Sequence, residues 1–305
     1  MDQFLLLVNT SLASISWTQI ALRYIEYIGY FLVYGALGFR WLVARTRRGP
    51  SASDGEAAFF ENALRSAARL GMAGALLLGI ELFLTGHHKV TTTSGFFAIA
   101  GPKVLIQLAF AGLSLLALAA AFARFPGAWI LASLAAIGFV FRNAASKNKW
   151  TAPVNPLHEA GGAIWLGTLL LIVLVGVPLI WRSQLPAIEE RGLLARLIKR
   201  FSLIALSGAA LMGVTGVITS WTHLKFFAAL WTTSYGITLC LKLLVVLAVV
   251  ILGAWNWRRI GPALEAQSHS TSLRRLSIAE LVFGAVVLLI TAVLVLLPSP
   301  SLPKG

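Results

Sequence analysis

Apolar residues form eight long runs along the chain, and short polar segments separate them. The runs cover roughly residues 18–43, 66–86, 102–123, 126–142, 157–181, 200–222, 236–257 and 277–297. A helix needs roughly 20 apolar residues to cross the hydrocarbon core of a bilayer, so continuous runs of this length predict transmembrane helices. The sequence therefore predicts an all-α polytopic membrane protein with eight transmembrane helices, of which 126–142 is the shortest.

The composition supports a lipid bilayer as the surroundings of this chain. Of its 305 residues, 58% are hydrophobic and 12% are charged, with a mean hydropathy of +0.83. Soluble domains carry about 25% charged residues. The net charge of +14 needs no nucleic-acid partner, because basic residues on short loops orient membrane proteins. The single cysteine, Cys240, excludes an internal disulfide bond.

The basic residues divide unequally between the two sides of the predicted bundle. The loops after the first, third, fifth and seventh runs hold fifteen: Arg45, Arg47, Arg48, Arg65, Arg69, Arg124, Arg182, Arg191, Arg196, Lys199, Arg200, Arg258, Arg259, Arg274 and Arg275. The other side holds seven: Lys89, Lys103, Arg142, Lys147, Lys149, Lys225 and Lys304. The positive-inside rule then predicts both termini outside, with 44–65 and 182–199 cytoplasmic. Residues 1–16 lack a basic start, so we expect a short interfacial segment there, not a cleaved signal peptide.

The two halves of the chain, 1–150 and 151–305, resemble each other at an offset of about 131–136 residues. Residues 24–35 (YIEYIGYFLVYG) align with 156–167 (PLHEAGGAIWLG), so Gly35 matches Gly167 and Glu26 matches His158. His87 likewise matches His223. Each half has an even number of predicted helices. The repeats are therefore expected to run parallel, related by an axis along the membrane normal.

Four of the five histidines fall on the predicted outer side, where carboxylates also lie near the helix ends. Imidazole is a common ligand of copper and zinc, and nitrogen together with oxygen donors suits Cu(II). Only Met72 and Met212 lie in predicted spans, which disfavours a thioether pathway for Cu(I). The candidate metal ligands are His87, His158, His223, Glu81, Glu26, Glu159 and His88. Adjacent residues of a helix project about 100° apart, so we expect His87 and not His88 to bind.

Structural explanations exist for several of these candidates. His87 and His88 can form a polar loop, Glu159 can complement a helix dipole, and Arg23 can pair with Glu26 along one helix. Asn155 and Pro156 have the chemistry of a helix cap and first turn, which would leave His158 free to point inward. Lys242 lies inside a predicted span at a cost of about 2.5–3.5 kcal/mol, so we interpret it as paired or structural and not as a metal ligand.

The second half resembles the copper resistance protein D family. The resemblance covers about 157–297 and rests on HEAGGAIWLG, RFSLIALSGAALMGVTGVITSW, SYGITLCLK, NWRR and the glutamate of the last span. It implies an inner-membrane protein that takes up copper, often with a periplasmic copper-binding protein as partner. The positions that match the family motifs are His158, Trp165, Gly167, Lys242, Asn256 and Glu280. Family members often carry a histidine where this chain has Glu26 and Tyr27.

These observations together predict a multi-pass protein of the bacterial inner membrane that binds copper and takes it up from the periplasm. The predicted outward-facing site combines His87, His158 and His223 with one carboxylate from Glu26, Glu81 or Glu159. We expect no enzyme activity, since no P-loop is present. Two alternatives remain open at this point: a haem-binding membrane protein that transfers electrons, and a structural partner in copper delivery. The oligomeric state is left open.

Overall fold

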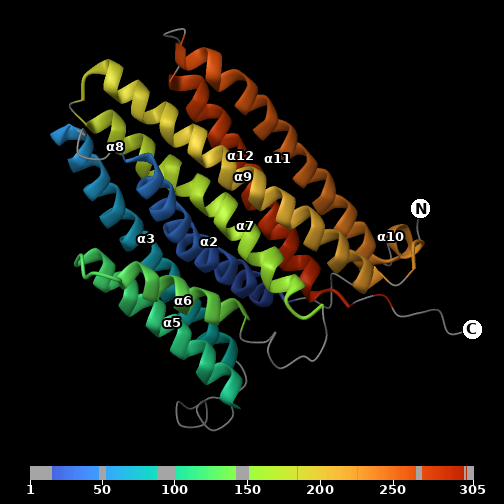
Figure 1. Ribbon diagram of the computed structural model, residues 1–305. Helices are drawn as coiled ribbons and strands as arrows, with labels where there is room; N and C mark the ends of the chain where they lie inside the picture. The colour runs from blue at the N-terminus through green and yellow to red at the C-terminus, as the bar shows by residue number, and fades with distance from the viewer. Residues whose placement is uncertain are drawn as a thin grey trace, which may run out of the picture.

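The computed structural model consists of long α-helices joined by short connections (Figure 1). It describes residues 16–47, 53–87, 101–141, 151–183, 185–224, 226–265, 270–298 and 300. The helices are α2 (Trp17–Thr46), α3 (Asp54–His87), α5 (Gly101–Phe122), α6 (Ala128–Phe141), α7 (Val154–Leu171), α8 (Val177–Arg182), α9 (Ala187–Leu224), α10 (Ala229–Thr232), α11 (Ser234–Glu265) and α12 (Ser270–Leu296). A π-helical turn, Ile172–Gly176, joins α7 to α8. Within these ranges the structure contains no strand.

Seven helical segments of the described ranges are long and apolar enough to cross a membrane: Trp17–Thr46, Asp54–Gly86, Val104–Phe122, Val154–Arg182, Ala187–Leu224, Ser234–Trp255 and Ile278–Leu296. The prediction of an all-α, multi-pass membrane protein is thereby supported. The eighth predicted span is only the 14-residue α6. At 1.5 Å per residue it is ~21 Å long, whereas the hydrocarbon core is about 30 Å thick. Eight full spans, the repeat and the outside termini therefore stay predictions.

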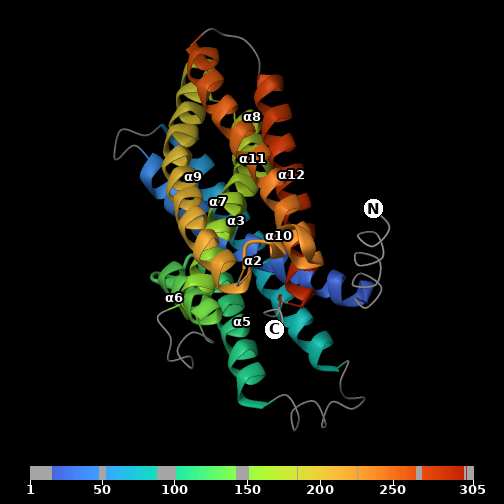
Figure 2. The same cartoon turned by 90° about the vertical axis from the view of Figure 1, so that its right-hand side faces the viewer.

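Helices α2 and α7 form the centre of the bundle (Figure 1). On one side α3 packs against α2, α5 against α3, and α6 against α5. On the other side α9 packs against α7, and α11 and α12 run side by side (Figure 2). The start of α2 and the end of α12 lie at the same end of the bundle. Helix α7 also begins at this end of the bundle, and α3 and α9 end there. We call it the cluster end, after the group of polar side chains described in the next subsection.

The two central helices touch through glycine. A Cβ atom added to Gly35 would lie 2.5 Å from the Gly167 carbonyl oxygen, and one added to Gly167 would overlap the Phe31 carbonyl oxygen and Gly35 Cα. Small residues permit this approach, and in lipid such close packing replaces the hydrophobic effect as the force between helices. The predicted repeat aligned these same two glycines.

Two tyrosines of α2 hold the short helix α6 against the centre. The Tyr34 hydroxyl donates to the Ala136 carbonyl oxygen at 2.6 Å, and the Tyr30 ring meets Phe139 edge-on with centroids 5.4 Å apart. Both tyrosine rings are buried. The hydrogen bond to Ala136 offsets part of the cost of burying the Tyr34 phenol.

We predict that Gly35→Ala and Gly167→Ala each destabilise the protein. Each added methyl group meets backbone atoms that cannot move aside, and overpacking of this kind costs about 1–3 kcal/mol or more. Thermal unfolding in detergent, followed by loss of the monodisperse peak in size-exclusion chromatography, measures the effect. Gly79→Ala is the matched control, because nothing lies within 4 Å of its added Cβ. Equal melting temperatures for all three variants would contradict the crossing.

We also predict that the start of α3 faces the cytoplasm and the end of α12 the outside. In a Cys240→Ala background, Asp54→Cys and Pro298→Cys place single thiols at exposed positions of opposite ends. An impermeant thiol reagent added to spheroplasts should modify only the Pro298→Cys variant. Modification of Asp54→Cys alone would reverse the orientation.

Candidate functional site

Charged and polar side chains from five helices gather inside the bundle toward the cluster end. We call this group the polar cluster. Its members are Arg23, Glu26 and Tyr27 of α2, Glu81 of α3, His158 and Glu159 of α7, Thr215 of α9 and Lys242 of α11. Ionisable residues at such depth are costly and occur where they face a partner or a polar pathway. The polar cluster is therefore the candidate functional site of the described residues.

The α2–α3 part of the cluster is built on two buried carboxylates. Glu26 is only 7% exposed and accepts from Arg23 Nη1 at 2.6 Å, which confirms the predicted helical ion pair. Glu81 is 3% exposed, and the Thr85 hydroxyl donates to its Oε1 at 2.7 Å. Arg23 also interacts electrostatically with Glu81. The Arg23 guanidinium thus interacts with the carboxylates of Glu26 on α2 and Glu81 on α3.

Glu159 of α7 interacts with residues of two other helices, α2 and α11. Its carboxylate interacts electrostatically with the Tyr27 phenol on α2 and with the Lys242 ammonium on α11. Its Oε1 also accepts from Asn155 Nδ2 at 2.8 Å. The prediction that Asn155 caps the helix is wrong, because α7 begins at Val154 and Pro153 stands at the cap without a side-chain bond. Asn155 lies in the first turn, where its amide reaches the residue four positions later.

His158 points into the α7–α9 interface, as the sequence predicted. Its Nδ1 lies 3.1 Å from the Thr215 hydroxyl, which itself donates its proton to the Leu211 carbonyl oxygen at 2.6 Å. The hydroxyl therefore accepts from Nδ1–H, and the neutral ring keeps a lone pair on Nε2. A Cβ added to Gly216 would lie 3.2 Å from the ring, so this glycine provides the space for the imidazole. A histidine oriented in this way is typical of a metal ligand.

Acidic side chains outnumber basic ones in the cluster. Glu26, Glu81 and Glu159 are acidic, while Arg23 and Lys242 are basic. Lys242 also interacts electrostatically with His158. In surroundings of low dielectric constant, interactions between charged groups are far stronger than in water.

The other predicted ligands do not join His158 in one site. His223 is exposed, its Nδ1–H donates to the Thr219 carbonyl oxygen at 2.8 Å, and its ring stacks on Tyr235. It follows Thr215 by eight residues, which is ~12 Å along a helix. The side chain of His87 and the whole of His88 lie outside the described residues. Within the described part of the chain, no group of three or more histidine, cysteine, aspartate or glutamate side chains is arranged to hold a metal ion.

The family-motif residues are distributed over the bundle. Gly167 lies at the central crossing, and Glu280 is buried on α12. Trp165 packs against Gly208, because a Cβ atom added to Gly208 would lie 2.9 Å from the Trp165 Cβ. The side chain of Asn256 lies outside the described residues. Thr215 and the coupling of Lys242 to Glu159 were not predicted. The only signal for Thr215 was a polar residue inside the small-residue stretch GVTG.

Comparison with known proteins identifies a related domain in the second half. Residues 195–294 match the family model of copper resistance protein D. The copper transport protein CutJ of Bacillus subtilis is 27% identical over 147 residues, which is 48% of this chain and 25% of that protein. The match thus spans about a quarter of the length of the curated relative. No solved structure matches the chain. The predicted resemblance to the copper resistance protein D family is thereby confirmed over residues 195–294, which include α11 and most of α9 and α12.

Proposed function

We propose that this protein binds copper at the outer face of the bacterial inner membrane and takes it up toward the cytoplasm. The family match and the name of the Bacillus subtilis relative support copper as the cargo. The seven apolar helical segments of the described residues support a membrane role. A periplasmic copper-binding protein would deliver the ion to the predicted outer side, which is the cluster end.

The excess of carboxylates over basic side chains in the polar cluster, three against two, is the observation that carries this proposal. Carboxylates in surroundings of low dielectric constant attract a cation strongly. Imidazole nitrogen, carboxylate oxygen and phenol oxygen are all ligands that copper accepts. His158 Nε2 is the nitrogen donor that we assign to copper. The neighbouring Glu159 projects about 100° away on the helix, so we assign it, with Glu26 and Glu81, the role of attracting the cation by charge.

This assignment modifies the predicted site. His158, Glu159, Glu26 and Glu81 belong to one cluster, whereas His223 lies about two turns further toward the predicted outer surface. We infer that His223, with His87 and His88 on the preceding predicted loop, captures copper at the entrance and passes it to the cluster. Imidazoles at the entrance, ahead of the carboxylates of the cluster, would let the ion lose its water in two steps.

We predict that Glu159→Gln and His158→Ala each weaken copper binding, on the order of ten- to a hundredfold. Gln keeps the size of Glu159 and its bond with Asn155 while it removes the charge. Isothermal titration of the purified protein in detergent measures the affinity. The matched control is Glu190→Gln, which removes a half-exposed carboxylate at the start of α9. Parental affinity in both cluster variants would refute the site. A Soret band in the absorbance spectrum would favour the haem alternative.

Two substitutions of Lys242 separate the effect of its charge on copper binding from the effect of its polarity. Lys242→Gln removes the positive charge but keeps a polar side chain, like Gln107 at the matching position of the first half. We predict that Lys242→Gln binds copper at least as tightly as the parent, because Glu159 then loses a competing cation. Lys242→Leu should bind at least fivefold more weakly than Lys242→Gln, because leucine offers no hydrogen-bonding group at this position, whereas glutamine does. Equal loss of affinity in both folded variants would show that the charge of Lys242 is itself required.

A further inference from the structure

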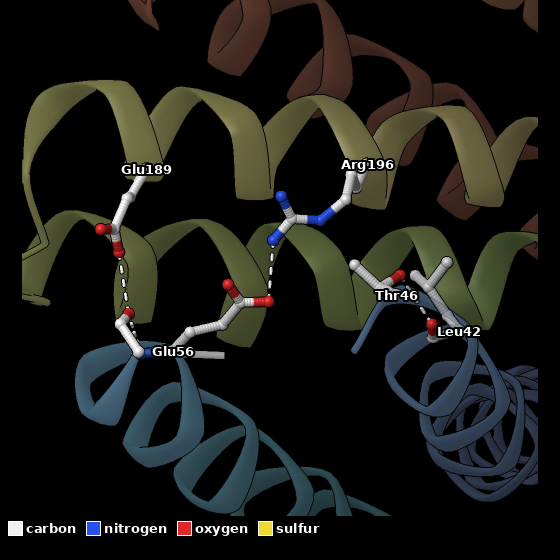
Figure 3. Close-up of polar contacts among 6 residues, drawn as sticks. Leu42, Thr46, Glu56, Glu189 and Arg196 are labelled. Atoms are coloured by element: carbon white, nitrogen blue, oxygen red, sulfur yellow. Dashed lines mark hydrogen bonds and ion pairs between the residues drawn. The ribbon is translucent and has the colours of Figure 1, made fainter. Parts of the chain in front are cut away.

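The end of the bundle opposite the polar cluster holds a second set of polar contacts, between α3 and α9. We call Ser53, Glu56, Glu189 and Arg196 the α3–α9 clasp. Arg196 Nη2 donates to Glu56 Oε1 at 2.8 Å, and the Ser53 hydroxyl donates to Glu189 Oε2 at 2.8 Å. Figure 3 shows Arg196 extending from α9 to Glu56 on α3, with Glu189 directed toward the start of α3. The clasp thus joins one helix of each half.

The two bonds of the clasp are reciprocal. A glutamate in the first turn of α3 accepts from α9, and a glutamate in the first turn of α9 accepts from the residue that precedes α3. Glu56 and Glu189 are separated by 133 positions, within the offset of the predicted repeat. The Ser53 hydroxyl also accepts a hydrogen bond from the Glu56 backbone N–H at 3.3 Å, so it both donates and accepts. The clasp therefore connects positions that the predicted repeat places at equivalent points of the two halves.

The clasp closes over a dry core. The Glu56 side chain is 5% exposed and that of Arg196 is 24% exposed, so the pair is shielded from water. Directly inside it lie the fully buried apolar side chains Ala63, Leu193 and Leu197, which pack with Phe39 and Leu42 of α2. A hydrated or bare cation that leaves the polar cluster toward this end meets apolar groups first and the clasp last.

The glycine crossing lies between the cluster and the clasp and can serve as a pivot. The two halves contact by backbone at Gly35 and Gly167, and a rotation about that contact would separate α3 from α9 without parting α2 from α7. Packed interfaces with two discrete arrangements are the usual basis of such changes. The structure shows the arrangement in which the clasp is closed.

We propose that the α3–α9 clasp is the inner gate of the copper pathway. Release of copper to the predicted cytoplasmic side then requires the bonds of Glu56 with Arg196 and of Ser53 with Glu189 to break while the glycine crossing holds. This inference rests on the proposed function for the identity of the cargo. The existence of a gate is tested without copper.

A buried reporter thiol measures whether the gate opens. In a Cys240→Ser background, Ala63→Cys places a thiol two turns inside Glu56 on the same face of α3, at a position that is 0% exposed. A small thiol reagent is added to inside-out vesicles, and the rate of modification is recorded. Glu56→Gln and Arg196→Gln should raise this rate at least tenfold. The charge-swapped pair, Glu56→Arg with Arg196→Glu, should return it to within about threefold of the background protein.

The matched control is Glu61→Gln on the same helix. Glu61 is about half exposed and pairs with Arg65 and Arg124 at the surface, not with α9, so its loss should leave the rate unchanged. Ser53→Ala is a milder variant that removes only the hydrogen bond to Glu189, and it should give an intermediate rate if the Gln variants fail to fold. Unchanged rates in every clasp variant that folds would overturn the gate.

Copper added to the background protein separates the two proposals. A copper-dependent rise in the modification rate supports both the gate and the cargo. Faster modification of the Gln variants with no response to copper supports a gate but counts against copper as its ligand. Faster modification together with unchanged copper uptake in the Gln variants would mean that the clasp is a structural tie, and the gate would be wrong.

Discussion

The backbone contact of α2 and α7 at Gly35 and Gly167 determines where the remaining helices can lie. In lipid, apolar side chains gain nothing by leaving their solvent, so close packing selects the partner of each helix. Glu26 and His158 each precede the crossing glycine of their own helix by nine residues, or ~14 Å along the axis. The crossing therefore brings these two positions, which the predicted repeat aligns, to one level, and the polar cluster forms around them.

This geometry separates the two kinds of polar contact in the bundle. At the cluster end three carboxylates lie with two basic side chains, Arg23 and Lys242. At the clasp end Glu56 pairs with Arg196, and Glu189 accepts from a neutral hydroxyl. The clasp bonds run directly from α3 to α9 and so hold these helices together, whereas the cluster gathers nitrogen and oxygen donors that suit a cation. The same residue types thus have different consequences at the two ends.

Hydrophobic runs were sufficient to predict the helices, because only a helix satisfies its own backbone hydrogen bonds across a bilayer. The alignment of Gly35 with Gly167 was predicted, but their contact was not. Three further features depended on tertiary packing and could not be read from spacing. Tyr30 and Tyr34 of α2 pack against α6, the partner of His158 is a threonine on α9, and Glu159 interacts electrostatically with Lys242, which is far away in the sequence.

The distance from cluster to clasp limits how copper could move. A cation that left the carboxylates for the apolar side chains beneath would lose all its ligands, and the idealised cost of moving an ion into such surroundings is of order 20 kcal/mol. No thermal fluctuation of a closed core meets that cost at a useful rate. Uptake by this fold therefore requires the apolar layer itself to part, so that water or polar groups reach the ion from the far side. Because α2 and α7 are locked at their glycines, the layer can part only on either side of that crossing.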